Sequence, residues 1–221
     1  MGEFLSGKSI AVTGAGQSDG TEPTSQVAEE VVAEIKKAGG EAVANANSVA
    51  EMDGGASIVK TAIDKFGRID GVVCVAGILR ERMLFNMSEN EWDPVIATHL
   101  KGTFTVFRAA AAAMREQKSG SLIRFTSGAF AGSVAQAKYS AAKGGIVSLV
   151  RSAAAGMYRY GVTANCIAPT AKTRMSANVP MEIGESGEPE DVAPMVVYLL
   201  SDQARDITGQ VYSVASGKIA V

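Results

Sequence analysis

The sequence predicts an α/β protein built on a parallel β-sheet with helices on both faces. Short runs of β-branched and apolar residues alternate along the chain with longer segments of helical period. One run, Ile69 to Ala76, is almost entirely apolar, which is typical of a strand buried on both faces. With 221 residues the chain can bury one continuous core, so we expect a single domain over 1–221.

The elements expected before the buried run are a strand at 9–13, a loop at 17–25, a helix at 25–38, a weak strand at 41–45 and a helix at 54–66. The first strand ends in a glycine turn, and Pro23 marks the loop. Gly39 and Gly40 stop the first helix, because glycine readily leaves helical backbone geometry.

The elements expected after the buried run are a helix at 88–117, a strand at 121–126, a helix at 136–159, a strand at 162–167, a helix at 188–200 and a strand at 210–214. Ser88 and Glu91 have the spacing of a capping box at the start of the long helix. We expect Pro169 to stop the strand before it. In sheets of this kind ligands bind at the carboxyl ends of the strands.

Composition argues against several classes of partner. The net charge is −2, so no basic field predicts binding to nucleic acid or to a membrane surface. The first residues lack a basic start followed by an apolar stretch, so we expect a cytoplasmic protein. Cys74 and Cys166 each lie in an apolar run, and we expect buried small hydrophobic residues rather than nucleophiles. No metal site is predicted.

Tyr139 and Lys143 are four positions apart, so both project from one face of a helix. A phenol has a pKa of about 10 and exchanges protons poorly at neutral pH. An ammonium about 4 Å away would lower that pKa by up to about 3 units at an effective dielectric constant of 20. Ser127 ends the preceding strand and could hydrogen-bond a substrate oxygen, although a helix cap or turn is the commoner role of such a serine.

These residues resemble the short-chain dehydrogenase/reductase family. The matching strings are Thr13-Gly14-Ala15-Gly16, Ala76-Gly77, Ser127 with Tyr139-Ser-Ala-Ala-Lys143, and Asn165-Cys-Ile-Ala-Pro169 followed by Thr173. They occur in the family's order from about residue 8 to 218. The resemblance implies a Rossmann-like, doubly wound parallel sheet in three layers, α/β/α. Ala76 to Arg80, Leu100 to Phe104 and Gly209 to Val214 are most similar to the branch of hydroxysteroid and 3-hydroxyacyl-CoA dehydrogenases.

The resemblance also implies a function, which is hydride transfer between a nicotinamide cofactor and a secondary alcohol or ketone. Tyr139 would be the acid/base, Lys143 would lower its pKa and bind the ribose, and Ser127 would polarise the substrate oxygen, with Thr126 as the alternative. His99 occupies the position of a family asparagine that supports a proton relay; a hydrogen-bonded helix residue without a catalytic role is the alternative. The implied cofactor-binding residues are Gly14, Gly16, Gly20, Asn47, Ala76, Gly77, Tyr139, Lys143, Ile167, Pro169 and Thr173.

The chain departs from the family in its first βαβ unit. The family's phosphate turn is followed by a helix and a second strand, whereas here Gln17 leads into a polar loop. About 30 residues are absent by typical element lengths, and with them the residue that selects NAD or NADP. The branch resemblance slightly favours NAD. We expect segments to be missing from this chain at Gln17–Ser18 and at Pro180–Met181, the second within the family's substrate-covering segment.

A rival interpretation is a catalytically inactive member of this fold that acts as a binding or scaffold protein. The retention of Ser127, Tyr139 and Lys143 argues for the enzyme. Small residues on the helices near 92–116 and 136–159 allow close helix packing, and the resemblance implies a homodimer or homotetramer. No group of polar residues in the sequence identifies the substrate. The resemblance to the hydroxysteroid and 3-hydroxyacyl-CoA branch implies a 3-hydroxyacyl or steroid-like alcohol or ketone.

Overall fold

The structure is a computed structural model that describes residues 4–15, 25–172 and 187–221. Its centre is a six-stranded sheet in the order β1-β2-β3-β4-β5-β6. The strands are β1 (Ile10–Thr13), β2 (Gly71–Cys74), β3 (Gly120–Phe125), β4 (Val162–Thr170), β5 (Val211–Ala215) and β6 (Lys218–Ala220). Strands β1 to β5 are parallel, and β6 pairs antiparallel with β5. The parallel sheet is as predicted, and β6 is an addition to the prediction.

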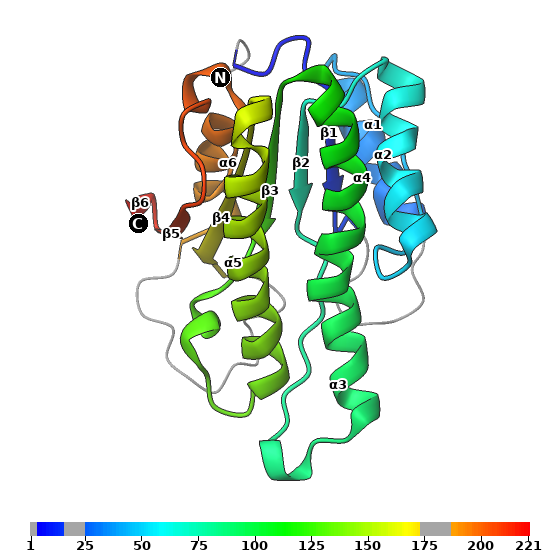
Figure 1. The fold of residues 1–221 in the computed structure, drawn as a ribbon. Coiled ribbons are helices and arrows are strands. Elements are labelled where there is room, and N and C mark those ends of the chain that lie inside the picture. Colours follow the sequence, from blue (N-terminus) through cyan, green and yellow to red (C-terminus); the bar gives the residue numbers. More distant parts are fainter. Residues whose placement is uncertain (1–3, 16–24, 173–186) are drawn as a thin grey trace.

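Helices cover both faces of the sheet. They are α1 (Ser25–Lys37), α2 (Met52–Phe66), α3 (Glu89–Ile96), α4 (Gly102–Gln117), α5 (Ala137–Met157) and α6 (Ala193–Leu200). Figure 1 shows α2, α4 and α5 on one face and α6 behind the strands on the other. The three-layer α/β/α arrangement predicted from the sequence is therefore confirmed.

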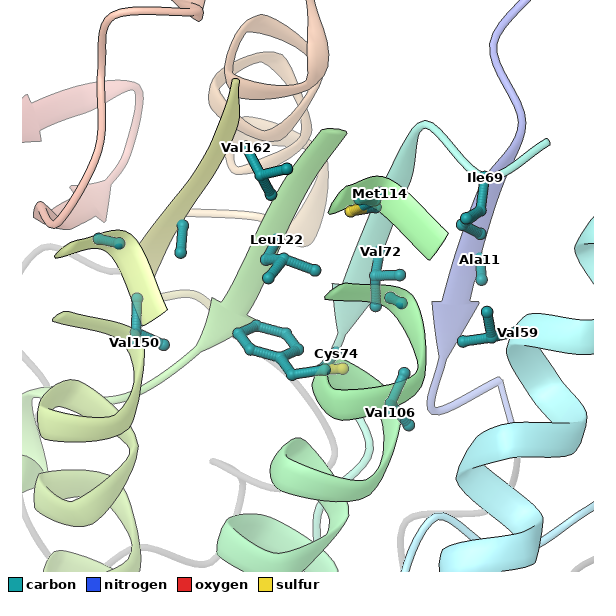
Figure 2. Close-up of a cluster of buried hydrophobic side chains, with 14 of the residues drawn as sticks. Ala11, Val59, Ile69, Val72, Cys74, Val106, Met114, Leu122, Val150 and Val162 are labelled. Carbon is teal, nitrogen blue, oxygen red and sulfur yellow. The ribbon is translucent and has the colours of Figure 1, made fainter. Parts of the chain in front are cut away.

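Alternation along the buried strands supplies a hydrophobic core to each face. Val72, Cys74 and Leu122 belong to the cluster that includes side chains of α2, α4 and α5, and Figure 2 shows them on the strands among the other side chains of that cluster. Val73 and Ile123, the intervening residues, belong to a second cluster with side chains of α6. Successive residues of a strand point to opposite faces, so β2 and β3 contribute to both clusters. This explains why the sequence pattern of β2 is continuous rather than alternating.

The strand predicted at 41–45 is wrong, because residues 41–48 have no regular secondary structure. A strand needs a hydrogen-bonded neighbour. In the described part of the chain β1 pairs only with β2. No further strand among the described residues therefore lies on the other side of β1 for residues 41–45 to pair with. Val12 on β1 is 61% exposed as a result. The described residues thus agree with an incomplete first βαβ unit.

The prediction that Pro169 stops its strand is also wrong. β4 continues to Thr170, and Pro169 is in register with Val214 of β5. The last register pair between β3 and β4 is Phe125 with Ile167, so at Pro169 the strand has a neighbour on one side only. A proline is tolerated there because a strand edge does not require its missing N–H.

The long helix predicted over 88–117 is interrupted in its first half. Ser88 caps it as predicted, with its N–H donating to Glu91 Oε2 at 2.9 Å. Between α3 and α4 the segment Ala97–Lys101 is π-helical, and it contains His99. Single π turns within α-helices are frequent at functional sites. Here the π-helical segment brings His99 to the loop after β2, with its Nε2 2.7 Å from the carbonyl oxygen of Ile78.

Candidate active site

The glycine turn after β1 lies against the loop after β2. Thr13 Oγ1 accepts hydrogen bonds from the N–H groups of Val75 and Ala76, at 3.2 and 3.3 Å. Gly14 has φ +95°, and a Cβ on it would lie 2.7 Å from the nitrogen of Ala76. Only glycine permits this close approach of the two backbones. The structure therefore brings Gly14, Ala76 and Gly77, all predicted cofactor-binding residues, to one edge of the sheet.

Tyr139 and Lys143 occupy successive turns of α5, as the spacing predicted. The Lys143 Nζ lies 5.2 Å from the centre of the Tyr139 ring and donates to the carbonyl oxygen of Phe125 at 2.8 Å. Phe125 is the last residue of β3. Lys143 is buried, so this hydrogen bond satisfies a charge that burial would otherwise leave without a partner. The ammonium thus connects α5 to the carboxyl end of β3.

The structure distinguishes Ser127 from its neighbour Thr126. Thr126 is buried and its Oγ1 donates to the backbone carbonyl of Lys143 at 3.1 Å, so its hydroxyl holds α5 to the strand end. Ser127 is less buried; its side chain accepts from the N–H of Ala129 at 3.3 Å, and its hydroxyl acts to lower the pKa of Tyr139. Ser127 therefore has both the turn role and a place beside the phenol.

His99 packs against Tyr139 from the π-helical segment. The two rings meet edge to face, with their centres 5.1 Å apart. His99 is buried, and its Nε2 lies 2.7 Å from the carbonyl oxygen and 3.0 Å from the nitrogen of Ile78. Thr103 Oγ1 donates to the carbonyl of His99 at 2.6 Å, which anchors the start of α4. The imidazole thus contacts the tyrosine and the loop after β2.

Burial dominates the pKa values of this cluster. It lowers the pKa of His99 to about 3, with further lowering by Lys143 and Arg124, so His99 is uncharged at neutral pH. Burial also lowers the pKa of Lys143 well below its usual value. The pKa of Tyr139 is raised by burial, against the lowering effects of the Ser127 hydrogen bond and the charge of Arg124. The sequence argument predicted a lowered pKa for Tyr139; it counted the ammonium and omitted desolvation.

The remaining predicted cofactor-binding residues differ in how far they are exposed. Ile167 is fully buried in the core on the α6 face, so its side chain is not at the surface of the site. Pro169 is half-buried on β4. Asn47 is exposed, and its side-chain nitrogen donates to Asn45 and to Ser57 of α2. Its amide is thus held within its own segment and α2.

Several predictions fall on residues outside those that the structure describes. These are the cofactor-binding roles of Gly16, Gly20 and Thr173 and the two interruptions expected at Gln17–Ser18 and Pro180–Met181.

Sequence reasoning missed Arg124, on β3. It is 1% exposed, and its guanidinium contacts the carbonyl of Cys74 and the ring of His99. The available signal was a charged residue inside the apolar run Leu122-Ile123-Arg124-Phe125. Charged residues are almost never fully buried without a partner.

Cys74 and Cys166 are buried and free, as expected. Burial raises their pKa values to about 11 and about 12, so both thiols stay protonated.

A cofactor with a nicotinamide and a ribose fits the donor set at this edge. The hydroxyls of Ser127 and Tyr139 and the ammonium of Lys143 are gathered at the strand ends. The close contact of Gly14 with Ala76 keeps side chains out of the neighbouring surface. Hydroxyl and ammonium donors suit a ribose diol and a carbonyl oxygen. Among the described residues no group of three or more His, Cys, Asp or Glu side chains could hold a metal ion.

A concavity lies away from these residues, at the amino-terminal ends of the strands. It has a volume of about 660 Å³, and charged residues such as Lys8, Arg68, Asp70 and Asp202 line it. Four of its charges form ion pairs, since Arg68 pairs with Asp70 at 2.6 Å and Lys8 with Asp202 at 2.9 Å. Ligands of parallel α/β sheets bind at the other edge, so we place the active site at Tyr139.

Comparison with known proteins identifies the family. The family model described as enoyl-(acyl carrier protein) reductase matches residues 20–218. A short-chain type dehydrogenase/reductase of Mycobacterium tuberculosis is 45% identical over 217 residues, which are 96% of this chain and 75% of that protein. A 3-oxoacyl-[acyl-carrier-protein] reductase of Synechocystis is 39% identical over 206 residues, 89% of this chain and 83% of the relative.

A longer relative and a solved structure agree with this family assignment. The peroxisomal multifunctional enzyme type 2 of Mus musculus is 42% identical over 197 residues, but this chain spans only 26% of its length. The crystal structure of a short chain dehydrogenase from Mycobacterium avium has a TM-score of 0.85 and 44% identity, covering 99% of this chain and 77% of that one. The chain belongs to the short-chain dehydrogenase/reductase family, and it is an oxidoreductase of the kind that acts on CH–OH and keto groups.

Proposed function

We propose that this chain interconverts a secondary alcohol and a ketone with NAD(H) or NADP(H), and that Tyr139 is its acid/base residue. The observation that carries the proposal is the grouping of three side chains at the carboxyl edge of the sheet: the Ser127 hydroxyl, which lowers the pKa of Tyr139, the phenol itself, and Lys143 one helical turn further along α5. A phenol, a hydroxyl and an ammonium in this arrangement can bind one oxygen atom and exchange a proton with it.

In the reducing direction the substrate carbonyl oxygen accepts hydrogen bonds from Ser127 and Tyr139. When bound, the reduced cofactor supplies a hydride to the carbonyl carbon. Tyr139 Oη gives its proton to the oxygen as negative charge develops there, which yields the alcohol and a phenolate. The raised pKa of Tyr139 keeps the phenol protonated before the reaction. In the oxidising direction the same atoms act in reverse, and the phenolate takes the proton from the alcohol.

Lys143 would stabilise the phenolate and hold the ribose of the cofactor. Its hydrogen bond to Phe125 fixes the ammonium at the end of β3, over the face of the Tyr139 ring. Gly14, Ala76 and Gly77 would approach the cofactor through their backbones, and Pro169 and Thr173 would lie on the nicotinamide side. The sequence lacks the family's second strand, whose last residue selects NAD or NADP; the branch resemblance slightly favours NAD.

We infer a 3-oxoacyl or 3-hydroxyacyl thioester as the substrate class. The Synechocystis relative is named as a 3-oxoacyl-[acyl-carrier-protein] reductase, which supports this choice. An apolar rim on the two loops next to the site also supports it. The rim consists of exposed side chains of Met83, Leu84, Phe85, Phe130 and Val134. A hydrogen bond of 2.8 Å from the N–H of Arg82 to the carbonyl of Ala135 joins the loops. An acyl chain could bury this apolar surface on binding.

The decisive experiment combines binding with turnover. NADH and NADPH fluorescence would be titrated with the protein, and a 3-oxoacyl thioester would then be added while nicotinamide absorbance is followed. We expect saturable binding of one nucleotide and substrate-dependent oxidation that is lost in Tyr139→Phe. Binding without turnover across β-oxoacyl, steroid and small ketone substrates would instead favour the rival scaffold function. Absence of binding would contradict cofactor use by this chain.

The assembly and location stay predictions. We propose a homodimer or homotetramer joined through the helix layer formed by α4 and α5. Phe104 on α4 and Tyr158 at the end of α5 are exposed aromatic residues on this layer, which supports the proposal. In the described part of the chain no helix is long and apolar enough to cross a membrane. A cytoplasmic location is the expectation from the sequence.

A further inference from the structure

Arg124 is a buried cation for which the described part of the chain provides no carboxylate partner. It lies in the middle of the sheet, in register with Cys74 of β2 on one side and Cys166 of β4 on the other. Both thiols are protonated and uncharged, so neither balances the guanidinium. Burying an arginine without a counter-ion is costly, and the cost is reduced only by hydrogen bonds to its N–H groups. The contacts of those groups therefore indicate what the residue does.

The guanidinium joins the loop after β2 to the π-helical segment. Its Nη1 donates to the carbonyl of Cys74 at 2.6 Å, and its Nη2 contacts the carbonyl of Ala76 at 3.1 Å. The same Nη2 lies 3.3 Å from both the carbonyl and the Nδ1 of His99. The Nε has no hydrogen-bond partner. One side chain thus holds the backbone before Gly77 and the π-helical residue that carries the imidazole.

This contact decides between the two neutral forms of His99. A guanidinium can only donate, so Nδ1 of His99 must accept and the ring proton must be on Nε2. The Nε2–H then donates to the carbonyl oxygen of Ile78, 2.7 Å away. In the other form, Nδ1–H would point at an N–H of Arg124, and the Ile78 carbonyl would lose its donor. Ile78 alone permits both forms, because its N–H is also within 3.0 Å of Nε2.

Neighbouring groups leave the imidazole of His99 little room to move or to reorient. A Cβ on Gly77 would lie 2.4 Å from Cε1 of His99, so the loop is already in contact with one edge of the ring. Tyr139 meets the ring edge to face at 5.1 Å. A displaced or reoriented imidazole would therefore move either the loop or the tyrosine ring.

We propose that Arg124 is a positioning residue: it holds His99 in the uncharged Nε2–H form and fastens the Cys74–Ile78 loop to the π-helical segment, so that Tyr139 is fixed in its reactive position. The inference depends on the proposed function only for the role of Tyr139; the form of His99 is independent of turnover. Titratable and charged groups face the imidazole from two elements: Arg124 from β3, and Tyr139 and Lys143 from α5.

The test uses the fact that His99 is the only histidine in the sequence. Untagged protein labelled with ¹⁵N-histidine has one imidazole, and its two nitrogen shifts report the tautomer and the charge. We expect the Nε2–H form in wild type at pH 7. Arg124→Met should produce the Nδ1–H form or a mixture and raise the pKa of His99, because a nearby positive charge and a donor are removed. Arg124→Lys keeps a charge and a donor, and should retain more of the Nε2–H form.

Kinetics and a control complete the test. Arg124→Met should lower kcat about 10-fold to 100-fold, the range that applies to groups orienting metal-bound histidines. Arg205→Met removes an exposed arginine at the opposite end of the sheet and should change neither the shifts nor kcat. Wild-type protein in the Nδ1–H form, or a folded Arg124→Met with wild-type shifts, would overturn the proposal. If Arg124→Met does not fold, the wild-type tautomer and Arg124→Lys decide it. An inactive wild type would contradict the proposed function, and the nitrogen shifts would still decide the tautomer.

Discussion

The ring of Tyr139 meets the imidazole of His99 edge to face, with 5.1 Å between ring centres and 89° between ring planes. Lys143 lies 5.2 Å from the centre of the same tyrosine ring. Tyr139 and Lys143 come from α5, whereas His99 comes from the π-helical segment between α3 and α4. The position of the phenol is therefore set by two helices that are separate in the sequence, and the following predictions test that arrangement.

Replacing Tyr139 by phenylalanine should abolish most of the activity without unfolding the protein. The substitution removes one hydroxyl and preserves the ring that packs on His99. We expect kcat to fall by about 10² to 10⁴, the usual contribution of a positioned proton donor. Steady-state rates and a thermal unfolding curve check both parts. Tyr158→Phe, at an exposed tyrosine, is the matched control. More than about a tenth of the wild-type rate in Tyr139→Phe would show that the proton comes from elsewhere.

Ser127 and Thr126 should separate into a catalytic and a structural role. Ser127→Ala removes the hydroxyl that lowers the pKa of Tyr139 and would bind the substrate oxygen, so kcat should fall while stability changes little. Thr126→Val removes a hydrogen bond to the carbonyl of Lys143, and should cost about 1 to 3 kcal/mol of unfolding free energy because that site is buried. Rates and urea unfolding of both variants check the assignment. The reverse pattern would make Thr126 the substrate-polarising hydroxyl.

A methyl group at Gly77 should disturb the site through His99. The Cβ of alanine would lie 2.4 Å from the imidazole, so the ring or the loop must move, and overpacking of this kind costs about 1 to 3 kcal/mol. We expect lower stability and lower kcat together. Gly156→Ala on α5 is the control, since nothing lies within 4 Å of its Cβ. That change should stabilise the helix by about 0.5 to 1 kcal/mol. Normal activity in Gly77→Ala would contradict a rigid contact between loop and ring.

His99 should make the protein lose stability in mild acid. Its pKa is lowered from 6.5 to about 3 in the folded state, so below pH 6.5 the unfolded chain binds a proton that the folded chain does not. The resulting stability is complete above pH 6.5 and is lost as the pH falls toward 3. Between pH 6.5 and 4.5 the loss should be about 2 to 3 kcal/mol.

His99→Asn is the appropriate comparison, because asparagine does not titrate and every carboxylate is common to both proteins. Urea unfolding of the two proteins at several pH values gives the difference directly. The advantage of wild type over the variant should shrink as the pH falls. A difference that is constant with pH would mean that His99 is protonated in the folded state as readily as in the unfolded chain.

The proposed assembly predicts a particle larger than one chain. Light scattering at micromolar concentration should return the mass of two or four chains. Phe104→Asp places a charge on the exposed face of α4 and should shift the particle toward one chain with the fold retained, as judged by circular dichroism. Arg205→Asp, at an exposed residue at the amino-terminal end of the sheet, should leave the mass unchanged. A wild-type monomer would contradict the assembly.

The sequence by itself determined the features that depend on local spacing. Strand–helix alternation predicted the parallel sheet, and a four-residue interval placed Tyr139 and Lys143 on one face of α5, because the helical repeat is set by the backbone alone. The capping box of Ser88 and Glu91 could be predicted for the same reason. These patterns do not depend on which other segment comes to lie nearby.

Only the tertiary structure decided the contacts between distant segments. The register of β2, β3 and β4 places Arg124 between Cys74 and Cys166, and the π-helical turn brings His99 to its guanidinium. The same is true of Pro169, which is tolerated because β3 ends before it. Desolvation likewise reversed the expected shift of the pKa of Tyr139, since burial arises from the packing of all the elements together. Such contacts join residues tens of positions apart, and no local period records which strands are neighbours or where each one ends.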